Sequence, residues 1–236
     1  MSRAERRELP APPRVGRVLR EAVSDLYYNS FRFLGANMLL GVTLIAILLA
    51  SVGSAWLLAL LPLAAVPAAG TMRMATCMVR RRHADFGDFT EIVRSPGAVL
   101  ALGLAQGVVT LVLVVDLWLG GAIGGWLGVL LSVSAVYGLL IGWAYAAVAW
   151  TLVLDPERDD DPISARLRLA AMILVAHPIR VGGYLLVVGL VLALSGLAIA
   201  PILTFTVALA WLAIAHFVLP VADRIEGRPT RVIEPD

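Results

Sequence analysis

The chain contains no lysine, so all 19 of its basic residues are arginines. Its single cysteine, Cys77, excludes an internal disulfide and says nothing of an oxidising compartment. The sequence has no phosphate-binding loop, no nucleophile elbow and no HExxH zinc helix. Its long apolar runs carry no charged residue at mid-depth, which disfavours a transporter coupled to ions through intramembrane carboxylates. We therefore expect a protein that is not an enzyme.

The histidines give no sign of a metal site. His83, His177 and His216 have spacings that match no metal-binding motif, so we interpret them as surface or packing residues. The acidic run at 155–161 is interpreted as a solvated loop, because clustered like charges resist packing, with a cation site as the alternative. We predict no catalytic residue, no cofactor and no metal ligand.

Composition gives the class of protein. The 236 residues are 60% hydrophobic, with a mean hydropathy of +0.87, and the apolar residues are concentrated in runs. A net charge of +2 would suit an anionic partner. Because the arginines flank the apolar runs, we expect that partner to be the lipid bilayer rather than nucleic acid.

The arginines also predict topology. They fall in four groups, and the turns between the groups near residues 51–54, 116–125 and 195–200 have none. By the positive-inside rule, the arginine-bearing segments are cytoplasmic. The groups lie within residues 3–32, 73–94, 158–180 and 224–231.

Six apolar windows are long enough to cross a bilayer, namely 32–52, 55–77, 97–119, 124–153, 181–198 and 200–221. We predict an all-α, polytopic integral membrane protein with these helices arranged as three hairpins and both termini cytoplasmic. Arginine in place of lysine, beside abundant alanine and glycine, is typical of a GC-rich bacterial genome, so we expect the bacterial inner membrane. The parts are a cytoplasmic segment 1–30, a transmembrane domain 31–222 with cytoplasmic loops 78–96 and 154–180, and a tail 223–236.

Segments outside the windows are predicted to form short helices. Residues 15–26 place their apolar side chains on one side, which suits a helix lying along the headgroups. Asp88 followed by Glu91 has the pattern of a helix N-cap. In the helix predicted at 163–176, one stripe carries Ile163, Leu167, Ala170 and Leu174.

Two sets of residues are candidates for contacts. Three consecutive arginines occur at 80–82. In the simplest interpretation they determine the topology, and in the alternative interpretation they bind a partner. The candidate partner-binding residues are Arg80, Arg81, Arg82, Phe86, Phe89 and Leu167. The candidate helix-packing residues are Asn37, Gln106, Gly124, Gly128, Gly138 and Gly142. Glycines spaced by four let helices approach closely, either within this bundle or against another membrane subunit or second copy, and the amides suit interhelical hydrogen bonds or substrate contact.

The order of these features resembles the YesL-like family of bacterial multi-pass membrane proteins. Leu61 to Gly70, with its two prolines, runs into the basic stretch and then into Asp88-Phe89, and residues 166–178 are similar to the family's helix before span five. The resemblance covers most of residues 25–222. It implies an accessory or regulatory partner of a carbohydrate ABC transport system, contacting permease or ATPase subunits, with no catalytic residues.

A function of another class stays open. The substrate-binding membrane subunit of an energy-coupling-factor type vitamin transporter is also a small helical bundle, and small-residue motifs can dock it on its partner. Its ligand needs a lid, and the external turns of this chain are short. A ligand that co-purifies with the protein would favour this alternative.

Overall fold

The computed structural model describes residues 15–196 and 205–228, and every element in these ranges is a helix. This confirms the predicted all-α class for the described residues. The elements are α1 (Val15–Tyr28), α2 (Ser30–Gly53), η2 (Ala55–Ala64), α3 (Ala65–Arg81), α4 (Phe86–Arg94), α5 (Gly97–Ile123), α6 (Gly125–Val153), η3 (Pro156–Arg158), α7 (Ile163–Ala176), α8 (Pro178–Gly196) and α10 (Val207–Glu226).

Several of these helices can cross a membrane. By length and composition α2, α5, α6 and α10 qualify, and α7 with α8, bent by 97° at the break between them, makes up to five. The windows predicted at 32–52, 97–119 and 124–153 agree with α2, α5 and α6 to within a few residues. The described residues therefore hold four to five helices that could cross a membrane, consistent with a helical membrane protein.

The window predicted at 55–77 is not one continuous α-helix. It forms the 3₁₀ helix η2 and then α3, which extends to Arg81. Pro62 lies inside η2 and Pro67 in the first turn of α3. Since proline cannot donate a backbone hydrogen bond in a helix interior but is tolerated in a first turn, the helix begins anew after Pro62.

The last two predicted windows are shifted. The window 181–198 corresponds to α8, which begins at Pro178, and the window 200–221 to α10, which begins only at Val207. Residues 197–204, where the two windows were divided, lie outside the described part of the chain.

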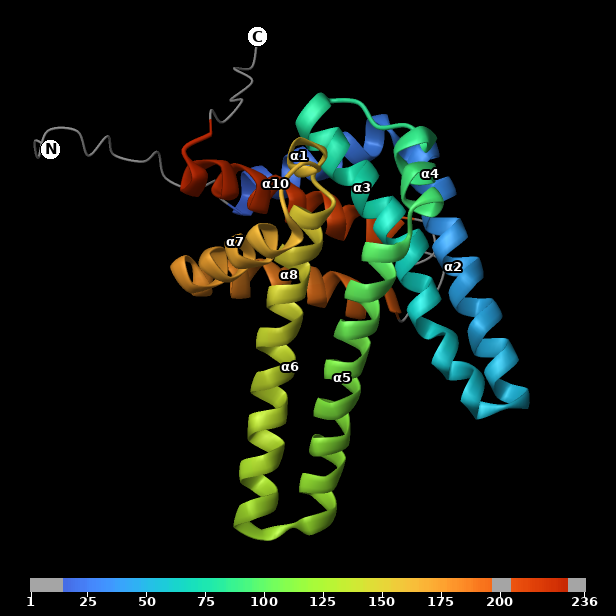
Figure 1. The fold of residues 1–236 in the computed structure, drawn as a ribbon, viewed down its shortest axis with the longest axis vertical. Coiled ribbons are helices and arrows are strands. Elements are labelled where there is room, and N and C mark those ends of the chain that lie inside the picture. Colours follow the sequence, from blue (N-terminus) through green and yellow to red (C-terminus); the bar gives the residue numbers. More distant parts are fainter. Residues whose placement is uncertain (1–14, 197–204, 229–236) are drawn as a thin grey trace, which may run out of the picture.

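The helices separate into a projecting hairpin and a more packed end. Figure 1 shows α5 and α6 extending side by side away from the other elements, while α1 and α10 lie across the end that also holds α3 and α4. Only 6% of the most apolar window of α5 is buried within the protein, against 72% of that of α10. The hairpin therefore exposes its apolar side chains, as a helix pair surrounded by lipid does.

Glycines close the tip of this hairpin. Gly124 and Gly125 both have positive φ, at 64° and 61°, and form the turn. Beside the turn, a Cβ atom on Gly128 would lie 2.3 Å from the carbonyl oxygen of Gly120, so the two helices meet backbone to backbone there. Glycine is required on both counts, because other residues are strained at positive φ and a side chain would separate the helices.

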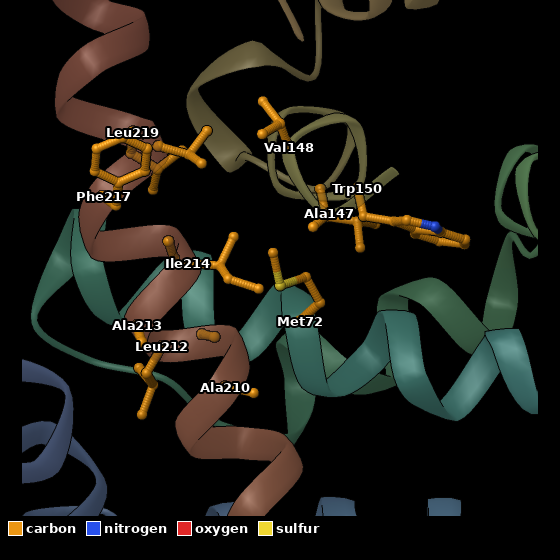
Figure 2. Close-up of a cluster of buried hydrophobic side chains, with 14 of the residues drawn as sticks. Met72, Ala147, Val148, Trp150, Ala210, Leu212, Ala213, Ile214, Phe217 and Leu219 are labelled. Carbon is orange, nitrogen blue, oxygen red and sulfur yellow. The ribbon is translucent and has the colours of Figure 1, made fainter. Parts of the chain in front are cut away.

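The hydrophobic core lies at the packed end. Met72 of α3, Trp150 of α6 and Phe217 of α10 come from three segments that are far apart in the sequence and meet in one cluster (Figure 2). Met72 is fully buried and Phe217 is 2% exposed. The core thus joins the end of the α5–α6 hairpin to α3 and α10.

The two predicted amphipathic helices pack differently from one another. The helix α1 contacts α10, and Val18 and Ala22 on its apolar side are both fully buried, while its placement along the headgroups stays a prediction. In α7 the buried residues are Arg166, Leu169, Ala170 and Ile173, so the predicted stripe shares only Ala170 with the observed one. Arg166 turns inward because it supplies hydrogen-bond donors to the end of α6.

Candidate functional site

The most distinctive polar feature is a buried cluster of charges where three helices end. Arg80 lies in the last turn of α3, and Asp223 lies near the end of α10. Asp155 and Arg158 come from the short connection that follows α6. A hydrophobic core at the helix ends brings these segments together, so charges far apart in the sequence become neighbours.

These four side chains form a closed ring, here called the ion ring. Arg80 donates two hydrogen bonds to Asp155, at 2.6 and 3.0 Å, and two to Asp223, at 2.6 and 2.9 Å. Arg158 also contacts Asp155 and donates to Asp223 at 2.7 Å. Each arginine therefore bridges both aspartates, and the four side chains carry two positive and two negative charges. Two more exposed carboxylates lie at the edge of the ring: Glu226 accepts from Arg158 at 2.8 Å, and Glu157 lies 3.3 Å from Arg80.

The ion ring is shielded from water. The side chains of Asp155 and Arg158 are 0% exposed, that of Asp223 is 3% and that of Arg80 is 8%. The expectation of a solvated acidic loop at 155–161 is therefore wrong for Asp155. Buried charges persist only when opposite charges and hydrogen bonds satisfy them, and here the counter-charges come from α3 and η3.

The ring keeps its arginines charged. Burial by itself lowers the pKa of a guanidinium. At Arg158 the attraction of Asp155 and the hydrogen bond to Asp223 outweigh burial, so its pKa is raised above the ordinary value. The pKa of Arg80 is raised for the same reason, against the effect of burial. Neither guanidinium can therefore exchange a proton as an acid or base would.

A second set of contacts completes the end of α6. Arg73 donates to the Leu154 carbonyl at 3.2 Å and to Asp159 at 2.9 Å, and Arg166 donates to the Val153 carbonyl at 2.7 Å. The last carbonyl groups of a helix have no partner within the helix. Arginine side chains supply those donors here, which fixes the end of α6 to α3 and α7.

The contacts of the cluster are those of a structural element that joins helices. Its arginines stay protonated, and arginine donors occupy both Asp155 oxygens and both Asp223 oxygens. Among the described residues, no group of three or more His, Cys, Asp or Glu is placed to hold a metal ion. The ion ring therefore rigidifies the junction of α3, α6 and α10.

A smaller polar contact joins α1 to α10. The Nε2 atom of His216 lies 2.8 Å from Asp25, and its Nδ1 atom lies 3.5 Å from Glu21. His216 and Asp25 are both buried. His216 is thus a packing residue that holds α1 in place, in agreement with the sequence-based interpretation.

The candidate partner-binding residues separate into buried and exposed ones. Arg80 belongs to the ion ring and Phe89 is 5% exposed, so neither is presented to a partner. Leu167 packs partly against the core. The side chains of Arg81 and Arg82 are 58% and 49% exposed. Phe86 is also exposed.

Phe89 instead fixes α4 to α3. A Cβ atom on Gly70 would lie 2.5 Å from the Phe89 ring, so the ring sits directly on the α3 backbone. The N-cap of α4 is Asp85 and not Asp88, which occupies the third helical position and completes a capping box. The prediction placed the start of this helix three residues late because both aspartates fit the pattern.

The candidate helix-packing residues also differ from one another. Gln106 accepts a hydrogen bond from the Trp150 indole N–H at 2.7 Å, which joins α5 to α6. A Cβ on Gly138 would lie 2.9 Å from Leu113, whereas one on Gly142 would meet no atom within 4 Å. Gly124 lies in the turn, and Asn37 is buried in α2.

Sequence reasoning did not find the ion ring, although a signal was present. Three predicted spans end close to a charge, at Arg80, Asp155 and Asp223, and opposite charges at neighbouring helix ends are free to pair. Arg73 was a further signal, because it fell inside a window predicted to cross the membrane.

In the described residues, the fold and the ion ring define an all-α protein with a charge-paired end, an exposed apolar hairpin and helices able to cross a membrane. Comparison of the chain with protein-family models, with curated proteins and with solved structures gives no match. The resemblance to the YesL-like family stays a prediction.

Proposed function

We propose that this chain is a non-enzymatic membrane protein of the bacterial inner membrane that acts as an accessory or regulatory partner of a carbohydrate ABC transport system. The YesL-like resemblance supports the carbohydrate system. The structure supports assembly over catalysis through one observation: α4 is a short helix outside the candidate spans that is held rigidly and leaves one face uncovered.

Three contacts hold α4. Its N-terminus has a capping box, Phe89 packs on Gly70, and Glu91 pairs with Arg73 at 3.1 Å. A surface that is already ordered loses less entropy when a partner binds. The rigid attachment of α4 therefore favours a role in recognition.

The exposed part of α4 has a mixed character. Val93 is 48% exposed, and Phe86 is 43% exposed while the tip of its ring packs on Gly35 of α2. Arg94 next to Val93 and Arg81 at the end of α3 are also exposed. These four residues are here called the α4 surface. Aromatic and arginine side chains are enriched at protein interfaces, so this surface suits a protein partner such as a permease or ATPase subunit.

The proposed topology has six crossings, with η2 and α3 as the second, and both termini on the arginine-bearing side. Contacts within the described chain support the placement of the termini. His216 joins α1 to α10, and Asp223 near the end of α10 joins Arg80 of α3. The two ends of the described chain therefore share one end of the molecule.

Photocrosslinking in native membranes tests the proposal. A crosslinker at Val93 is expected to capture a permease or ATPase subunit, and the double variant Arg81→Ala/Arg94→Ala is expected to lose that adduct while still inserting. The matched control is Arg180→Ala, which changes an exposed arginine at the start of α8. If Val93 gives only lipid adducts while a small molecule co-purifies stoichiometrically, the substrate-binding alternative becomes the better account.

A further inference from the structure

The junction of α1 and α2 carries an unusual group of exposed rings. Tyr27, Tyr28 and Phe31 are 76%, 81% and 87% exposed. The buried side of α1 is held on α10, so these rings do not belong to the face that packs inside the protein. Three large rings so fully exposed within five residues call for an apolar or amphipathic surrounding.

Cationic side chains lie at the same junction. Arg32 donates to the Ala84 carbonyl at 2.7 Å and lies 3.4 Å from the His83 ring, and Arg82 lies 3.6 Å from Asp25. These contacts hold the loop between α3 and α4 against the α1–α2 junction. The His83 side chain is 62% exposed and that of Arg82 is 49% exposed, so a partner outside the protein can reach both.

The nearby carboxylates are already engaged. Asp25 is buried and lies 2.8 Å from His216. Asp85 accepts the backbone N–H of Asp88 at 3.2 Å, and its half-exposed carboxylate lies 4.0 Å from His83, so one negative charge stands against the two arginines. Arg32 has no carboxylate within ion-pair distance among the described residues. The charge that this junction offers to an outside partner is therefore positive.

We propose that Tyr27, Tyr28, Phe31, Arg32, Arg82 and His83, here called the junction surface, bind the headgroup of an anionic phospholipid at the arginine-bearing side of the membrane. Aromatic rings are favoured at the depth of the headgroups, and guanidinium groups bind phosphate through paired donors. The position agrees with this role, because the junction includes the first turn of the candidate span α2.

The opposite end of the chain provides a contrast. Trp118 and Trp126 are 70% and 77% exposed beside the α5–α6 turn, where no arginine occurs. This tip lies far from α1 and α4 in Figure 1. Aromatic rings occur at both ends, but of these two ends only the junction surface combines them with cations, so anionic lipid is expected to bind at the junction surface and not at the tip.

The test uses the full chain in nanodiscs of neutral phosphatidylcholine, into which phosphatidylglycerol is titrated and its binding is measured by native mass spectrometry. Phosphatidylglycerol is expected to bind more tightly than added phosphatidylcholine. Its binding is expected to weaken as the salt concentration rises. The variant Arg32→Gln/Arg82→Gln is expected to weaken the binding of phosphatidylglycerol by about fivefold for each charge removed, because that factor corresponds to the attraction between one basic residue and an anionic surface. Arg168→Gln, an exposed arginine on α7, is the matched control.

A second variant protects the test against misfolding. Tyr27→Ser/Tyr28→Ser/Phe31→Ser removes only exposed rings and is expected to lose phosphatidylglycerol while its helix content and lipid-free melting temperature stay the same. Trp126→Ser is its control. Equal binding of the two lipids, equal loss in a control variant, or displacement of the lipid by inorganic phosphate would each overturn the proposal.

Discussion

Removing one arginine from the ion ring should destabilise the protein strongly. In Arg158→Met, Asp155 and Asp223 would remain buried with Arg80 as the only cation of the ring between them. Loss of one partner from a buried ion pair costs about 3 to 5 kcal/mol, because an uncompensated charge remains. For a chain of this size that corresponds to a fall in melting temperature of roughly 6 to 20 °C.

The assay is thermal unfolding in detergent, followed by circular dichroism, with Arg168→Met as the control. Arg168 is exposed, so its replacement is expected to change the free energy of unfolding by less than about 0.5 kcal/mol. Arg158→Lys keeps the charge but cannot bridge two aspartates in the same way, and should lie between wild type and Arg158→Met.

A double variant separates charge balance from lost packing. Arg158→Met/Asp155→Asn removes one charge of each sign, so the ring is neutral again. Its destabilisation is expected to fall short of the sum of the single effects by about 1 to 3 kcal/mol. Additive effects, or an equal loss of stability in Arg168→Met, would refute the reasoning that the ring is stable because its charges are paired.

Three further predictions concern packing and topology. Gly128→Ala should lower the free energy of unfolding by about 1 to 3 kcal/mol, because its Cβ would lie 2.3 Å from a backbone oxygen. In the control Gly121→Ala the Cβ meets no atom within 4 Å, so stability should not change. Equal effects of the two variants would contradict the close approach. His216→Leu should release α1 from α10. A cysteine placed at Val18 in a cysteine-free background should then react with a thiol reagent in detergent on the order of ten times faster. Unchanged labelling would show that apolar packing alone holds α1. In intact cells, a cysteine at Gly121 should react with an impermeant reagent added outside and one at Ser164 should not, and the opposite result would invert the proposed topology.

The sequence predicted the apolar helices well where charged or turn residues end them sharply. The windows for α2, α5 and α6 agree with the structure because length and hydropathy decide such helices. Between α8 and α10 no charge divides the apolar run, so hydropathy alone gives no sharp start for the window 200–221, whose first residues lie outside the described part of the chain. For η2, the two prolines between Leu61 and Gly70 gave no prediction of the 3₁₀ geometry that resulted.

The charged cluster could not be predicted in the same way. Arg80 is 75 residues from Asp155 and 143 from Asp223, so only the packing of the helix ends brings them together. The same limitation explains α7. The predicted apolar stripe of α7 does not include Arg166. In the structure Arg166 points inward, because it donates a hydrogen bond to the Val153 carbonyl at the end of α6, which has no partner within its own helix. Sequence patterns describe one helix at a time. These contacts depend on the unpaired carbonyl groups and charges that a neighbouring helix presents.

The ion ring raises the question of why charges occupy a position that apolar residues could fill. Well-packed apolar residues are often as stable as a buried ion pair, so stability alone does not account for the ring. Charges, however, are costly within the hydrocarbon layer. We therefore expect a ring at the ends of α3, α6 and α10 to hold these ends at the boundary of the membrane and to fix their register. If so, Arg158→Met should also give mixed labelling at Ser164 in intact cells; labelling that stays one-sided would leave the ring with a role in stability only.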